Sequence, residues 1–160
     1  MMGWYHPLIT LESCHQHLWK TKHMALFGLF GRKKQGYASP WLQLTVVYAT
    51  SPSGLEPAHK FAVRGKVLTS GPIEFEYIEP GSYVAFFPGT ASGLVAGNQL
   101  ADDLRLIAQQ KAVPNFGVGV QQGECLAQLR GTGRFVAKPA GKIISQALAL
   151  AIEEANAHAG

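Results

Sequence analysis

A segment near the end of the chain carries the most suggestive side chains for ligand binding. Arg130 and Arg134 flank a Gly-Thr-Gly sequence, and Lys138 and Lys142 follow at intervals of four residues. Free backbone N–H groups in a glycine-containing loop, with cations beside them, are groups that bind phosphate. The segment does not have the spacing of either common phosphate-binding glycine motif. A surface hairpin loop is therefore the interpretation that the spacing favours, and anion binding is the alternative.

Zinc-ligand side chains occur near the start of the chain, at Cys14, His15 and His17. Thiolate and imidazole are the ligands that zinc prefers, but a structural site needs four of them in a closed cage. Only His6 and His23 lie nearby to complete a set. The sequence therefore favours a loose polar segment and predicts no metal site.

Other reactive side chains do not form a catalytic set. Glu74 and Glu76 would share one face of a strand, but no base or nucleophile accompanies them. Cys125 and His59 are far apart in the sequence, and no motif connects them. We expect Cys125 to be a core thiol, and the sequence predicts no catalytic residue and no cofactor.

The composition indicates a single globular domain. The chain has 160 residues, of which 47% are hydrophobic and 15% are charged. No apolar run approaches the roughly 20 residues that cross a bilayer, and the start lacks the order of a signal peptide. The two cysteines form no disulfide framework, so we expect a cytoplasmic protein.

The net charge of +4 is confined to the start of the chain. Residues 1–36 contain five basic side chains against Glu12, whereas the other residues balance nine basic with nine acidic side chains. Nucleic-acid binding needs basic side chains gathered on a folded surface, so we do not expect it. We interpret 1–36 as a poorly ordered lead and 37–160 as one domain. Met24 resembles a natural start, which would make residues 1–23 an extension.

A short apolar group in this lead raises the question of membrane binding. Leu26, Phe27, Leu29 and Phe30 precede three basic residues, an arrangement that could rest on an anionic bilayer. Four apolar anchors give weak binding at best, so we do not expect membrane association. A disordered lead whose apolar residues pack on the domain or on a partner is the favoured interpretation.

The elements of the domain follow from hydrophobic periodicity and turn residues. Strands are predicted at 41–48, 66–69, 73–78, 83–87 and 116–120, a short helix at 55–63 and longer helices at 90–111 and 143–158. The turn at 79–81 predicts a hairpin, residues 124–129 are ambiguous, and 130–134 form a loop. The order predicts an α+β fold with a ferredoxin-like βαββαβ core, a mixed or antiparallel sheet and helices on one face.

Four short motifs also occur in an order typical of one known family. They are Gly65-Lys66-Val67, the segment from Gly81 to Pro88 with Ala85 and Phe86 within it, the Val-Gly-Val-Gln-Gln-Gly-Glu segment from Val118 to Glu124, and the Gly-Lys-Ile-Ile-Ser-Gln-Ala segment from Gly141 to Ala147. Over roughly residues 42–150 the chain resembles the catalytic domain of class III nucleotide cyclases, itself an elaborated βαββαβ core. The short first helix predicted here departs from that family.

The resemblance implies that this chain has lost the functional residues of the family. Cyclases hold two divalent ions with two carboxylates, which would fall near Thr50 and at Ser82, side by side on neighbouring strands. The family's Asn and Arg, which stabilise the transition state, would fall near Ser145 and Ala149, and its usual Asp is Lys142. None of these positions carries the family's residue type, so the resemblance implies a degenerate, non-catalytic domain.

We therefore expect a non-catalytic interaction or regulatory module on a cyclase-like fold, one that self-associates because cyclase domains pair. The partner would be a second copy or another protein. The second hypothesis is a domain that binds a nucleotide or another phosphorylated small molecule through the four basic residues of the 130–142 segment. An enzyme of unrecognised chemistry is the third.

Overall fold

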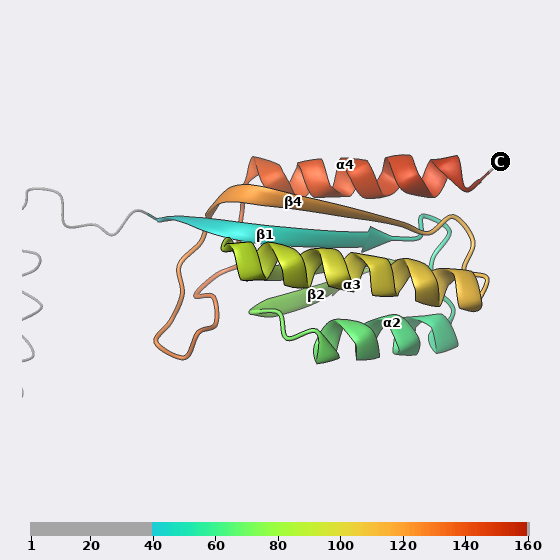
Figure 1. Ribbon diagram of the computed structural model, residues 1–160, viewed down its shortest axis with the longest axis horizontal. Helices are drawn as coiled ribbons and strands as arrows, with labels where there is room; N and C mark the ends of the chain where they lie inside the picture. Colours follow the sequence, from blue (N-terminus) through green and yellow to red (C-terminus); the bar gives the residue numbers. More distant parts are fainter. Residues whose placement is uncertain (1–39, 160) are drawn as a thin grey trace, which may run out of the picture. The chain divides into compact units, whose positions relative to one another are not determined.

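The computed structural model describes residues 40–159, which form a four-stranded antiparallel sheet with three helices (Figure 1). The strand order is β2-β3-β1-β4. The elements in chain order are β1 (Trp41–Thr50), α2 (Pro57–Thr69), β2 (Glu74–Ile78), β3 (Ser82–Pro88), α3 (Ala91–Gln110), β4 (Gly117–Leu126) and α4 (Lys142–Ala157). The predicted α+β class and ferredoxin-like βαββαβ core are confirmed by this order.

The central strand β1 is apolar along most of its length because both of its faces are covered. Side chains alternate across a strand, so Val47 and Ala49 enter the core beneath α2 and α3. Val46 and Tyr48 enter a second core beneath α4. The predicted strand over 41–48 is confirmed and extends to Thr50.

Helices α2 and α3 cover one face of the sheet. Pro57 begins α2, where its missing N–H costs no helical hydrogen bond. Thr90 caps α3, because its hydroxyl oxygen accepts a hydrogen bond from the Gly93 N–H at 3.2 Å. The predicted strand over 66–69 is wrong. These residues continue α2, since Val63 and Val67 lie one helical turn apart and are both buried against the sheet.

Helix α4 covers the opposite face of the sheet, as Figure 1 shows. The prediction of helices on one face is thus right for the two helices of the βαββαβ core, and α4 is added on the other side. Its buried side carries Ala147, Ala151 and Ala155, which face Gly117 and Gly119 of β4. With no side chain on these glycines, the helix backbone lies directly against the strand.

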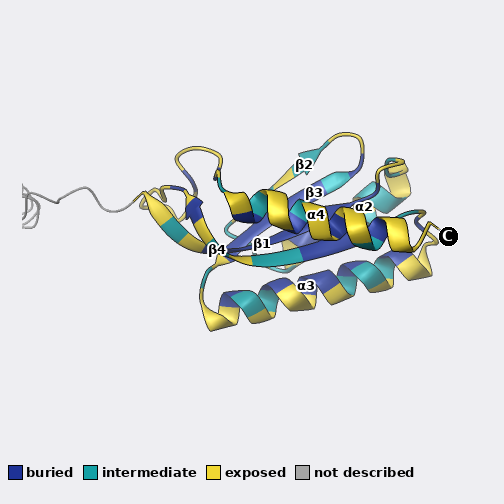
Figure 2. Cartoon of the chain, turned by 90° about the horizontal axis from the view of Figure 1, so that it is seen from above, coloured by how far each residue is buried: buried dark blue, intermediate teal, exposed yellow. Residues whose placement is uncertain are grey.

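The loop from residue 127 to residue 141, orange in Figure 1, covers the part of this second face that α4 leaves open. The Phe135 ring packs edge-on against the Phe86 ring, with centroids 5.6 Å apart. Cys125 is fully buried in the same core, and burial raises the pKa of its thiol, as expected of a core cysteine. In Figure 2 the buried residues of α3 lie along the side of the helix that is next to the sheet.

Several predictions lie outside the described residues. These concern the poorly ordered basic lead, the start at Met24, the absence of a zinc site at Cys14 to His17 and the absence of membrane binding by Leu26 to Phe30. Within residues 40–159, no helix combines the length and the hydropathy that a membrane crossing requires.

Candidate functional site

The two positions that the resemblance assigns to metal-binding carboxylates lie side by side. Thr50 ends β1 and Ser82 begins β3, and they are direct partners across the antiparallel ladder. Their hydroxyl oxygens are 2.8 Å apart, so one hydroxyl donates a hydrogen bond to the other. Thr50 is only 4% exposed. The register thus places two neutral hydroxyls side by side at these positions.

Ser51 fixes the backbone around this pair. Its N–H donates to the Gly81 carbonyl at 2.9 Å, which joins the end of β1 to the turn between β2 and β3. Its hydroxyl lies 3.0 Å from the carbonyl oxygens of both Gly54 and Pro114, to either of which it can donate. Three loops therefore meet at one buried serine, which holds Thr50 and Ser82 in a rigid setting.

The three remaining cyclase-like positions lie on another part of the chain. Lys142, Ser145 and Ala149 all lie on the exposed side of α4, opposite its buried alanines. The N-terminal part of α4 lies against Gly123, whereas its C-terminal part lies against Gly117, the partner of Thr50 in β4. The structure therefore does not bring Lys142 or Ser145 to the Thr50–Ser82 pair within one chain.

The four basic residues proposed for anion binding separate into different environments. Arg130 and Arg134 line the same pocket at the surface. Lys138 instead forms an ion pair with Glu76, with Nζ 2.7 Å from Oε2. Lys142 is the first residue of α4 and does not line that pocket. Only the two arginines thus form a common site.

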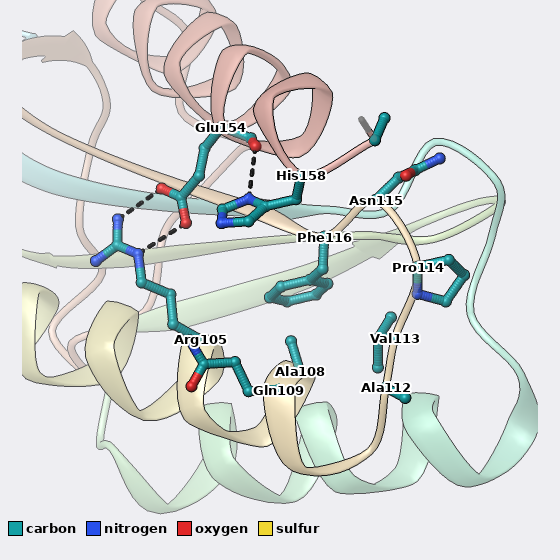
Figure 3. Close-up of a pocket in the computed structure, with 11 residues that line it drawn as sticks. Arg105, Ala108, Gln109, Ala112, Val113, Pro114, Asn115, Phe116, Glu154 and His158 are labelled. Carbon is teal, nitrogen blue, oxygen red and sulfur yellow. Dashed lines mark hydrogen bonds and ion pairs between the residues drawn. The ribbon is translucent and has the colours of Figure 1, made fainter.

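A second pocket, of about 350 Å³, lies where the C-terminal ends of α3 and α4 meet the start of β4 (Figure 3). Arg105 of α3 and Glu154 of α4 form a bidentate ion pair there, with both N–O distances 2.8 Å. His158 closes the end of α4, with its Nδ1 2.8 Å from the Glu154 carbonyl oxygen. Apolar side chains such as Phe116 complete the lining.

The Arg105–Glu154 pair also protects the outer edge of the sheet. β4 is an edge strand, whose outward carbonyl and N–H groups would otherwise be free to pair with another strand. Arg105 Nη2 donates to the Val118 carbonyl at 3.1 Å. Sequence reasoning missed this pair because the two residues are 49 positions apart and neither has a distinctive neighbour.

The same pair should make stability depend on pH. The Arg105 guanidinium holds the pKa of Glu154 below its ordinary value of 4.5, against the opposing effect of burial. A lowered pKa in the folded state contributes stability that is present above pH 4.5 and is lost as the pH falls below it. We expect Glu154→Gln to lower the free energy of unfolding by about 1 kcal/mol at pH 7, because the pair is partly exposed.

Urea unfolding between pH 7 and pH 3 would measure this effect. The difference between the wild type and Glu154→Gln should shrink as the pH falls. Glu153→Gln is the matched control, since Glu153 is an exposed neighbour with no ion pair among the described residues. A difference between wild type and Glu154→Gln that stays constant across the range would contradict the assignment.

Comparison with known proteins gives structural neighbours and no sequence relatives. No protein-family model and no curated protein matches the chain. Among solved structures, the chain is similar to the guanylyl cyclase Cya2, with 13% identity and a TM-score of 0.46 over 75% of this chain and 79% of that one. It is also similar to two structures of a bacterial light-regulated adenylyl cyclase, with 11% and 10% identity and TM-scores of 0.43.

Those two matches cover 88% and 92% of this chain, which spans about half the length of each light-regulated cyclase. The neighbours are guanylyl and adenylyl cyclases, the enzymes that the sequence motifs resemble. The strand order and the placement of α2 and α3 on one face of the sheet make the core of this chain ferredoxin-like.

Proposed function

We propose that the domain is a non-catalytic interaction or regulatory module that self-associates. The observation that carries this proposal is the hydrogen-bonded pair of Thr50 and Ser82 at the two positions where the resemblance implies carboxylates. Magnesium and manganese ions need anionic oxygen ligands beside a nucleotide's phosphates. Two neutral hydroxyls that bond to each other do not supply them.

The surroundings of the pair offer no substitute. Among residues 40–159, no three side chains of His, Cys, Asp or Glu are grouped so that they could hold a metal ion. Ser145 and Ala149, on the exposed side of α4, lack the amide and guanidinium groups that stabilise the cyclase transition state, and Lys142 stands where the family has an Asp. Positioning and electrostatic stabilisation, the main sources of catalysis in phosphoryl chemistry, would therefore have no evident source at these positions.

An interaction role fits the apolar side chains on the outer side of α2 and α3. Phe61 and Leu68 lie two turns apart on α2, and they are 81% and 53% exposed. Val95 and Leu106 lie three turns apart on α3, and they are 69% and 51% exposed. We call these four residues the α2–α3 apolar surface. Exposed apolar side chains of this kind can contribute to a protein interface.

Sedimentation equilibrium tests the proposal, because removing apolar surface from an interface weakens association. We expect the wild-type chain to form dimers and Phe61→Asp to shift it towards monomers. Ile152→Asp is the matched control, since Ile152 is an exposed apolar residue of α4, on the other side of the sheet. A monomeric wild type would contradict self-association. Cyclic nucleotide formation from ATP or GTP would contradict the non-catalytic role.

A further inference from the structure

We propose that Arg130 and Arg134 bind the phosphate group of a small molecule whose remaining part is apolar. This inference goes beyond the proposed interaction role and does not depend on it. The two arginines line an open pocket of about 610 Å³ between the loop after β4 and the connection from α2 to β2. The other residues that line it are Leu68, Pro72, Ile73, Glu74, Phe75, Thr132 and Phe135.

A tight turn places the two arginines opposite each other. The Arg130 N–H donates to the Arg134 carbonyl at 2.7 Å, and Leu129 pairs with Phe135 in the next antiparallel position. Gly133 allows the turn, because its φ of 78° lies in the region that favours glycine. Residues paired directly across such a ladder have Cβ atoms about 5 Å apart. Both arginines line the same pocket, and we infer that their guanidinium groups can contact one anion there.

No ion pair within the described residues engages the charge of these two arginines. Neither arginine side chain makes a hydrogen bond or ion pair with any residue of the described 40–159 region. Like charges placed directly opposite each other across a ladder destabilise it. By contrast, Lys138 is neutralised by Glu76. A bound anion would relieve the repulsion between the arginines and use the fork geometry of both guanidinium groups.

One carboxylate, that of Glu74, also lines the pocket. Its Oε2 accepts a hydrogen bond from the Phe135 N–H at 3.3 Å, which holds it in place. The pocket still has more positive than negative charge, because two arginines face one glutamate. The negative charge of Glu74 nevertheless repels an incoming anion. Glu74→Gln should therefore increase the affinity for phosphate, an effect that a chance surface contact elsewhere would not produce.

The rest of the pocket suits an apolar ligand body. Leu68 is 53% exposed although it is apolar, and Pro72, Ile73 and Phe75 continue the apolar lining from the same side. Burial of apolar ligand surface adds to the affinity, whereas phosphate alone would use only the charged end. A phosphomonoester on an aromatic or aliphatic group should thus bind more tightly than inorganic phosphate.

Isothermal titration and amide NMR shifts of the full chain, with phenyl phosphate and inorganic phosphate as probes, would test the site. We expect phenyl phosphate to bind at least tenfold more tightly than inorganic phosphate, and to shift amide signals at 73–75 and 130–135. Arg130→Ala and Arg134→Ala should each weaken phenyl phosphate binding at least tenfold. Glu74→Gln should strengthen it.

Arg64→Ala is the matched control, because Arg64 is another exposed arginine, on α2, that does not line the pocket. It should bind phenyl phosphate as the wild type does. No binding of phenyl phosphate, or an equal loss in Arg64→Ala and Arg134→Ala, would overturn the proposal. The two proposals share Leu68, but neither arginine belongs to the α2–α3 apolar surface, so loss of phosphate binding and loss of self-association can be distinguished.

Discussion

Gly119→Ala should lower the free energy of unfolding by roughly 3 kcal/mol, the upper part of the usual range for an overpacked core. A Cβ at Gly119 would lie far inside contact distance of the Ala147 carbonyl oxygen and 2.9 Å from the Ala151 nitrogen. Both atoms belong to the backbone of α4, so no side-chain rotation can make room. The helix must move away from β4 and lose contacts along its alanine side.

Urea unfolding followed by circular dichroism would measure this loss. Gly65→Ala is the matched control, because a Cβ there meets no atom within 4 Å. Gly65 lies inside α2, so alanine should stabilise the protein by about 1 kcal/mol through helix propensity. Equal effects of the two substitutions would contradict the close contact of α4 with β4.

The placement of α4 was the part of the fold that helical periodicity could not predict. Periodicity identifies the side of a helix that is buried, but not the sheet face on which it packs. A signal was present in β4, where Gly117, Gly119 and Gly123 all point to the same face because strand side chains alternate. A strand face without side chains needs a helix with small ones, and α4 has alanines at 147, 151 and 155.

The second half of α2 shows where local propensity failed. Val67, Leu68 and Thr69 are residue types common in strands, which led to the predicted strand over 66–69. In the structure Val67 is buried one turn after Val63, and Lys66 forms an ion pair with Asp103 of α3 at 2.7 Å. Tertiary contacts with the sheet and α3 thus outweigh a weak strand preference.

The candidate functional residues also differ in how well the sequence predicts which of them are neighbours. The resemblance placed Thr50 and Ser82 on neighbouring strands, and the antiparallel register of β1 with β3 brings them together, although α2 and β2 separate these two strands in the chain. The Arg105–Glu154 pair depends instead on where two distant helices end. The pairing of Arg130 with Arg134 depends on the local turn at Gly133. The sequence could not predict that Lys138 instead pairs with Glu76, which removes it from the group of four basic residues.

The double substitution Thr50→Asp and Ser82→Asp should give the protein a manganese response that the wild type lacks. Without metal, two carboxylates at partner positions with buried surroundings repel each other, so the variant should be several kcal/mol less stable at pH 7. A bound Mn²⁺ ion would relieve the repulsion, because the two carboxylates would coordinate it with the anionic oxygens that it prefers. At 100 times its Kd the metal adds about 2.7 kcal/mol, or about 10 °C in Tm.

Thermal unfolding with and without MnCl₂ measures this difference, and the matched control is the double substitution Thr50→Asn and Ser82→Asn. Asparagine has nearly the shape of aspartate but no charge, so it should show neither the repulsion nor the metal response. A manganese response of the wild type would contradict the proposed loss of metal binding. If the Asp variant unfolds at the same temperature with and without manganese, the register of β1 and β3 does not form a metal site. The correspondence of Thr50 and Ser82 to the cyclase carboxylate positions would then hold in sequence but not in metal binding. This follows because the correspondence requires only that two adjacent aspartates, held by rigid surroundings, bind a metal ion.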